Sequence, residues 1–287
     1  MTDAPLTGPM DEPVVDAQEA RRARRRRIES TARYLLPVLV MALMIWLWDR
    51  IVVWNEIPHF ILPGPDRVWD YLTTNWSNLA DAAFLTGRIT LMALVVAVIG
   101  GAGLAILFNQ SRMVELSLYP YAVILQVTPV VAIAPLIFIY VESKVAGMLM
   151  CAWIVAFFPV LSSTTLGLNS VDRNLRDLFS IYGATRWQRL IFLQLPSALP
   201  YFLGGLRIAG GLSLIGAVVA ELVAGTGGVG IGLAGRIQEA GYRLNIAGMF
   251  ASLSLIAAMG VFIFGLLSLL SHLLLRKWHE SALKQEG

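Results

Sequence analysis

The residues that could carry chemistry are few in this 287-residue chain, and they do not form a catalytic set. The run from Gly225 to Gly230 fits the spacing G-x-G-x-x-G, but it follows a long apolar run rather than the strand that dinucleotide binding requires. The sequence contains no G-x-x-x-x-G-K-[ST] motif for nucleotide phosphates. His59, His272 and His279 are widely separated, and the single Cys151 lies inside an apolar run, which excludes an internal disulfide. We therefore expect no catalytic residues, no metal site and no cofactor.

Two charged residues inside an apolar run, Arg207 and Glu221, are the main candidates for a polar binding site. They are fourteen residues apart, so on a helix they would lie on nearly one face. Ionisable groups at membrane depth usually face a cavity or a partner. One hypothesis is that this face, with Thr128 and Ser163, lines a pathway in which Arg207 favours anions. The alternative is that Arg207 extends to the inner interface and Glu221 lies in the outer one, while hydroxyls such as that of Ser163 bond to their own helix.

The docking segment, residues 172–200, is a charged stretch between two long apolar runs. Apolar residues recur at helical spacing in its first part, at Leu175, Leu178, Phe179 and Tyr182. Gly183 follows, where positive φ has a low steric cost, and then a second short helix that we expect to stop at Pro196. In that helix we expect Trp187, Leu190 and Ile191 on one face, with Arg186 and Arg189 exposed. A polar loop needs no such order, so we interpret the segment as a rigid surface feature that docks onto a partner.

The composition indicates an all-helical membrane protein. The chain is 57% hydrophobic and 14% charged, with a mean hydropathy of +0.68, whereas soluble domains contain about 25% charged residues. Several runs reach the roughly 20 residues that cross a bilayer. About six spans are predicted, at 34–54, 89–108, 116–141, 145–167, 198–222 and 246–275. Pro120, Pro129 and Pro135 predict kinks or breaks in the third. Residues 55–88 are expected outside the membrane, with a short amphipathic helix near Asp66.

The charge distribution predicts that both termini are cytoplasmic. Residues 1–20 hold five acids and no base, and six arginines follow between Arg21 and Arg27. A basic run directly before an apolar helix indicates topology rather than nucleic-acid binding, and the late apolar run does not fit a cleavable signal peptide. With the N-terminus inside, fifteen Lys and Arg residues fall on the inner side and six on the outer. We expect a disordered tail at 1–33, a membrane domain at 34–275 and a cytoplasmic tail at 276–287.

The docking segment resembles the coupling loop of the permease subunits of ABC importers. That loop carries E-A-A, then Gly-Ala, then Leu-Pro, and this chain has Gly183-Ala184 and Leu195-Pro196 at matching places, with Thr185-Arg186-Trp187 as the usual continuation. Further motifs are similar to the nitrate, sulfonate and taurine branch: Leu62-Pro63 with Pro65, Thr128–Leu136, Gly167–Asp172, Gly205-Leu206-Arg207 and Ala220-Glu221-Leu222. One departure is that Asp177-Leu178-Phe179 replaces E-A-A, which keeps the acid but makes the face bulkier.

The resemblance implies the type I importer permease fold, a coupling loop at about 168–197 and a multi-pass subunit of a bacterial inner membrane. It implies a second permease copy, forming a homodimer, separate ABC ATPase subunits and an extracytoplasmic substrate-binding protein, with no nucleic acid. The residues expected to contact the ATPase are Asp177, Phe179, Gly183, Ala184, Arg186, Trp187 and Pro196. A small anion of the nitrate, sulfonate or taurine type, or a vitamin precursor, is the implied substrate.

Two other function classes predict different residues. A secondary transporter driven by an ion gradient would need buried acids or histidines at mid-membrane and an inverted repeat, and neither is clear in the sequence. An intramembrane enzyme would need paired catalytic groups at one depth, and no such pair is found. Survival of an ATPase in detergent-purified complexes would distinguish the importer from both.

Overall fold

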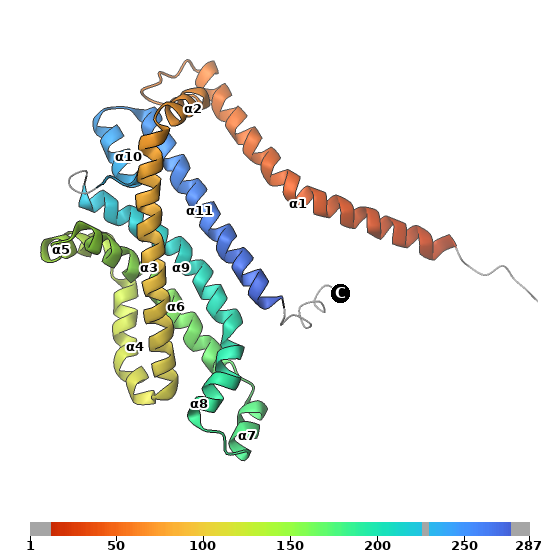
Figure 1. The fold of residues 1–287 in the computed structure, drawn as a ribbon. Coiled ribbons are helices and arrows are strands. Elements are labelled where there is room, and N and C mark those ends of the chain that lie inside the picture. Colours follow the sequence, from red (N-terminus) through yellow and green to blue (C-terminus); the bar gives the residue numbers. More distant parts are fainter. Residues whose placement is uncertain (1–12, 226–229, 277–287) are drawn as a thin grey trace, which may run out of the picture. The chain divides into compact units, whose positions relative to one another are not determined.

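In a computed structural model of the chain, residues 13–225 and 230–276 are described, and the elements within them are helices (Figure 1). The chain divides into two compact units, residues 1–65 and residues 66–287. Within the described ranges, five helices are long and apolar enough to cross a membrane, or six if a bent pair counts as one span. The predicted all-α membrane fold with about six spans is confirmed at this level.

The first unit contains one long helix, α1 (Pro13–Trp54). The expected disordered tail is therefore wrong for residues 13–33, and residues 1–12 lie outside the described residues. Ala, Arg, Glu and Gln dominate this stretch and are strong helix formers, so the helix extends N-terminally from the apolar part. The apolar part, Leu35–Trp54, buries nothing within the chain.

The second unit begins with the short helix α2 (Pro65–Thr74), which confirms the amphipathic helix predicted near Asp66. The next helix, α3 (Trp76–Gln110), begins thirteen residues before the predicted start at residue 89. Asp81 and Arg88 interrupt the apolar run but do not interrupt the helix, because helix formation does not require continuous hydrophobicity. The predicted extramembrane stretch 55–88 is thus helical from Trp76 onward.

The third predicted span is broken. It consists of α4 (Arg112–Val127) and α5 (Val130–Tyr140), which meet at 102°. Thr128 and Pro129 between them have extended backbone, as expected for a proline and the residue before it. Pro120 and Pro135 lie inside the two helices, so Pro129 alone marks the break.

The next helices are α6 (Lys144–Asn169), α7 (Arg173–Ile181) and α8 (Arg186–Arg189), followed by a π-helical turn, η1 (Leu190–Gln194), and by α9 (Leu195–Ala224). The predicted stop at Pro196 is wrong, because residues Arg186–Ala224 form one continuous helical stretch of 39 residues. In η1 the Leu195 N–H donates to the Leu190 carbonyl, five residues back. This register shift places Pro196 in the first turn of α9, where its missing N–H is tolerated.

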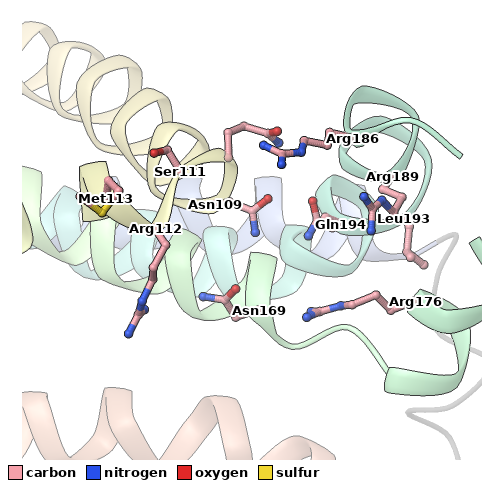
Figure 2. A pocket seen from close by; sticks show the side chains of 11 residues that line it. Asn109, Ser111, Arg112, Met113, Asn169, Arg176, Arg186, Arg189, Leu193 and Gln194 are labelled. Carbon is pink, nitrogen blue, oxygen red and sulfur yellow. The ribbon is translucent and has the colours of Figure 1, made fainter. Parts of the chain in front are cut away.

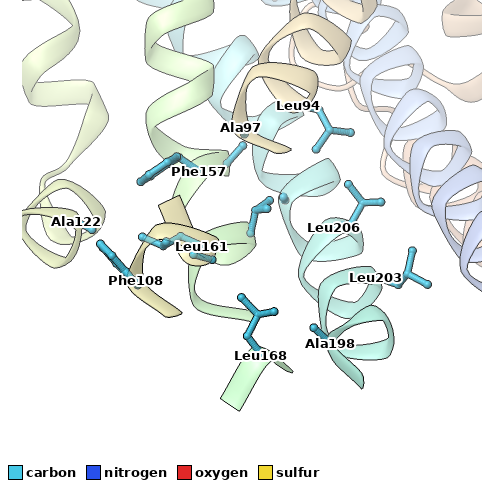
Figure 3. Close-up of a cluster of buried hydrophobic side chains, with 14 of the residues drawn as sticks. Leu94, Ala97, Phe108, Ala122, Phe157, Leu161, Leu168, Ala198, Leu203 and Leu206 are labelled. Carbon is cyan, nitrogen blue, oxygen red and sulfur yellow. The ribbon is translucent and has the colours of Figure 1, made fainter. Parts of the chain in front are cut away.

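The core lies between α3, α6 and α9, while α10 (Leu233–Tyr242) and α11 (Ile246–Leu275) complete the second unit. Figure 3 shows Leu94, Phe157, Leu161 and Leu206, which these three helices contribute to one cluster of buried side chains. Glycines allow close crossings: an added Cβ at Gly216 would lie 2.7 Å from the Cα of Ala152. The pairing of α6 with α9 is therefore set by backbone proximity.

Candidate functional site

The turn between α7 and α8 is closed by backbone hydrogen bonds on both sides of Gly183. The Gly183 N–H donates to the Ser180 carbonyl at 3.1 Å, and the Ala184 N–H donates to the Phe179 carbonyl at 2.9 Å. This pattern is a Schellman motif with Gly183 at φ +68°. An added Cβ at Gly183 would have no neighbour within 4 Å, so conformation rather than space selects glycine there.

Both short helices of the docking segment have side-chain caps. The Asp172 carboxylate accepts from the Asn174 N–H at 2.7 Å at the start of α7. Thr185 and Gln188 form a capping box at the start of α8: the Gln188 N–H donates to Thr185 Oγ1 at 3.3 Å, and the Thr185 N–H donates to Gln188 Oε1 at 2.8 Å. The sequence analysis missed this box, although the T-x-x-Q spacing of residues 185–188 was its visible signal. These caps build an ordered surface feature from local contacts.

The docking segment exposes large apolar side chains. Ile181 and Tyr182 are each 82% exposed, Trp187 is 64% exposed, and α7 contains no buried residue. Asp177 and Arg186 are also exposed, while Phe179, Ala184 and Pro196 are half-buried. Clusters of exposed apolar side chains with a polar rim are typical of sites for protein partners.

The apolar face predicted for the second helix of the segment is divided. Leu190 is buried and packs in the core, whereas Ile191 is 51% exposed. Arg189 is half-buried rather than exposed. The π-helical turn accounts for this difference, because α8 continues into α9 and the side of the helix bearing Leu190 faces the core. The docking segment therefore packs in the core at Leu190, where α8 continues into η1.

Arg207 and Glu221 are not brought together. The Arg207 guanidinium lies 5.7 Å from the centre of the Phe264 ring, and its buried Nε has no hydrogen-bond partner among the described residues. The Glu221 side chain is 3% exposed, and Thr86 Oγ1 donates to its Oε1 at 2.6 Å. Glu221 therefore points into the protein, which differs from both positions considered for it from the sequence.

Thr86 and Glu221 together cap α10. The Leu233 N–H donates to Thr86 Oγ1 at 2.9 Å, and the Ala234 N–H donates to Glu221 Oε2 at 2.9 Å. These two donors belong to the first turn of α10, so the network joins α3, α9 and α10. The sequence analysis missed Thr86 because it placed residues 55–88 outside the helical core.

The two hydroxyl candidates, Thr128 and Ser163, have different surroundings in the fold. Thr128 Oγ1 donates to the Ile124 carbonyl at 2.7 Å at the end of α4. Ser163 lies at the crossing of α6 and α9, where an added Cβ at Gly205 would approach its Oγ within 2.6 Å. Thr128 therefore bonds to its own helix and Ser163 lies at a helix crossing, and their role in a pathway stays a prediction.

Known proteins similar to this chain are transport permeases. Residues 93–278 match the family described as "Binding-protein-dependent transport system inner membrane component". The chain is 35% identical over 253 residues to the riboflavin transport system permease protein RibX of Chloroflexus aurantiacus, covering 86% of this chain and 90% of that protein. It is 31% identical over 233 residues to the taurine transport system permease protein TauC of Escherichia coli, covering 77% and 82%. Among solved structures, an amino acid ABC transporter crystallised with histidines superposes with a TM-score of 0.59 at 16% identity, over 70% of this chain and 96% of that one.

Proposed function

This chain belongs to the family of binding-protein-dependent transport system inner membrane components, and we propose that its docking segment couples it to a separate ATPase subunit. As a permease of an ABC importer, it contributes membrane-spanning helices to the route that the substrate follows.

One observation carries the proposal: the exposed α8 and the core helix α9 form one continuous helical stretch. Arg186–Ala224 is 39 residues long, and α9 packs closely against α6 along its length. A displacement of α8 by a bound partner would therefore move α9 without an intervening flexible loop. Nucleotide-dependent affinity of that partner for two states supplies the energy that shifts such an equilibrium.

The docking residues divide into two roles in this proposal. The first group fixes the backbone of the segment. Gly183 and Ala184 form the Schellman turn, and Pro196 lies in the first turn of α9. Trp187 and Arg186 are exposed and contact the partner. Asp177 and Phe179 belong to the same contact on α7, with Asp177 exposed and Phe179 half-buried.

The substrate is inferred as a small anion or a vitamin precursor. The names of similar permeases include riboflavin, taurine, aliphatic sulfonates and nitrate. Arg207 favours the anionic members of this set, because its half-buried guanidinium has a buried Nε without a partner in the described part of the chain. Its ring contact with Phe264 would hold the side chain in place.

The remaining assembly is inferred from the family and the charge distribution. We expect a second permease copy, forming a homodimer, and an extracytoplasmic binding protein that delivers substrate. The excess of Lys and Arg on one side supports a cytoplasmic position for the docking segment and both termini. Within the second unit, Leu275 at the end of α11 packs on the same core cluster as Leu190, which supports a common side for the C-terminus and the docking segment.

Two tyrosines provide a matched test of the docking surface. Tyr182 is 82% exposed beside Gly183, and Tyr242 is 76% exposed at the end of α10. Tyr182 precedes α9 in the chain and Tyr242 follows it, and the 30 residues of α9 span about 45 Å. Tyr182→Ser should reduce recovery of the ATPase with the tagged permease at least about tenfold, as for a buried aromatic anchor, whereas Tyr242→Ser should leave it unchanged. Equal recovery with both variants, or uptake that needs no ATPase, would refute the proposal.

A further inference from the structure

A cavity of about 510 Å³ lies beside the docking segment, where four helices end or begin. Its walls come from the end of α3, the start of α4, the end of α6, and from α7, α8 and η1. Figure 2 shows Arg176 extending from α7 toward Asn169, and Arg186 extending from α8 toward the turn between α3 and α4. Its size is within the range that holds small ligands, about 300–1,000 Å³.

The lining is cationic and contains no acid. Arg112, Arg176, Arg186 and Arg189 are among its eleven residues, together with the amide side chains of Asn109, Gln110, Asn169 and Gln194. Arg112 is paired with Glu115 at 2.7 Å. Within the described ranges, the other three arginines have no carboxylate within 4.0 Å. Several guanidinium groups without a counter-charge repel one another, so an anion in this cavity would be stabilised.

Two further observations indicate the kind of anion. The Nε of Arg176 is a buried donor with no hydrogen-bond partner among the described residues, so its hydrogen-bonding capacity is unused there. Ser111 in the wall is the N-cap of the 16-residue helix α4, whose first N–H groups carry partial positive charge. Planar guanidinium donors with amide donors suit the oxygens of a phosphate group.

We propose that this cavity binds a phosphate group. Two sources are possible for it: a free phosphate compound, or the headgroup of an anionic phospholipid. The wall includes Met113, which is 74% exposed, and the exposed Leu116 follows it on α4. An apolar helix face beside a cationic cavity at the helix ends favours the lipid. The inference does not depend on the coupling of this chain to an ATPase.

Arg176→Gln and Arg173→Gln form the matched pair for the test. Both remove one arginine from α7, but Arg176 lines the cavity, whereas Arg173 is exposed and does not. The full-length chain, purified in a neutral detergent, is titrated with phosphatidylglycerol or with phosphatidylcholine, and bound lipid is counted by native mass spectrometry. Inorganic phosphate is added as a competitor in a second series.

We expect the wild type and Arg173→Gln to bind phosphatidylglycerol alike, and Arg176→Gln to bind it about fivefold more weakly, with a larger loss when Arg189→Gln is added. Phosphatidylcholine binding should not distinguish the variants. Competition by millimolar inorganic phosphate would show recognition of a free phosphate group, and absence of competition would assign the site to the lipid. Equal phosphatidylglycerol binding by all variants, or equal loss in both single variants, would overturn the proposal. Loss of ATPase recovery in Arg176→Gln without any change in lipid or phosphate binding would also overturn it, because the cavity would then accept acidic groups of a protein.

Discussion

Gly183 allows a graded test of whether the shape of the docking segment matters apart from its side chains. Its φ is +68°, and an added Cβ would meet nothing within 4 Å in this chain, so a small uncharged substitution acts within the chain through the backbone. An L-residue in this left-handed conformation costs about 1–2 kcal/mol, less for Asn and more for a β-branched residue. A cost of that size reduces the population of the native turn about 5- to 30-fold relative to competing conformations.

If only the native turn binds the ATPase, the apparent affinity falls with the fraction of molecules that hold this turn, by at most the same factor. We therefore expect the dissociation constant for the purified ATPase to increase in the order wild type, Gly183→Asn, Gly183→Ala, Gly183→Val, with an increase of up to about 30-fold for Ala. Gly183→Asp combines the backbone effect with a charge and should assemble poorly and abolish transport. The affinity is measured by surface-immobilised binding in detergent, with ATP-dependent uptake measured in parallel.

Gly103 provides the control for this series. It is exposed in α3 and also has no neighbour within 4 Å of an added Cβ, but its backbone is helical. Gly103→Ala should leave ATPase binding unchanged and should stabilise α3 by up to about 1 kcal/mol. Equal affinity for Gly183→Asn, Gly183→Ala and Gly183→Val would refute the reasoning, because no graded backbone effect would exist.

Three further predictions concern the interior. Gly205→Ala should destabilise the protein by about 1–3 kcal/mol, because its Cβ would lie 2.8 Å from the Pro159 carbonyl oxygen, while Gly204→Ala, with open space on the same helix, should raise stability in detergent unfolding by up to about 1 kcal/mol. Glu221→Ala should lower unfolding free energy by about 3 kcal/mol through loss of hydrogen bonds to a charged group, and Glu221→Gln by less, since it keeps one acceptor. Arg207→Gln should reduce uptake of the substrate with little change in ATPase recovery, and unchanged uptake would remove Arg207 from the pathway.

The helices could be predicted from hydropathy, but their ends could not. Hydropathy locates membrane spans because the bilayer demands about 20 apolar residues, and it therefore misses helix that continues beyond the bilayer. The start of α3 at Trp76 and of α1 at Pro13 are both of this kind. Pro129 lies at the predicted break, whereas Pro196 does not end its helix. The π-helical turn before Pro196 places it in the first turn of α9, where its missing N–H is tolerated.

The candidate site was predictable where its signal is local. The turn at Gly183 and the short helices beside it follow from residues within a few positions of one another. The network of Thr86 and Glu221 joins residues 135 positions apart, so no spacing rule in the sequence reports it. The cavity of arginines is equally non-local, because its walls come from four separate parts of the chain.

The helix runs without interruption from α8 through η1 into α9, and a paired substitution in η1 can show whether force passes along it. Ile191→Gly with Phe192→Gly should weaken the helix by about 2 kcal/mol relative to Ile191→Ala with Phe192→Ala, while both pairs remove the same exposed side chains. The measurement is the number of substrate molecules imported per ATP hydrolysed in proteoliposomes that contain the complete transporter. We expect the alanine pair to keep this ratio, and the glycine pair to hydrolyse ATP while importing several-fold fewer substrate molecules per ATP. The same ratio in both variants would contradict transmission through a continuous helix.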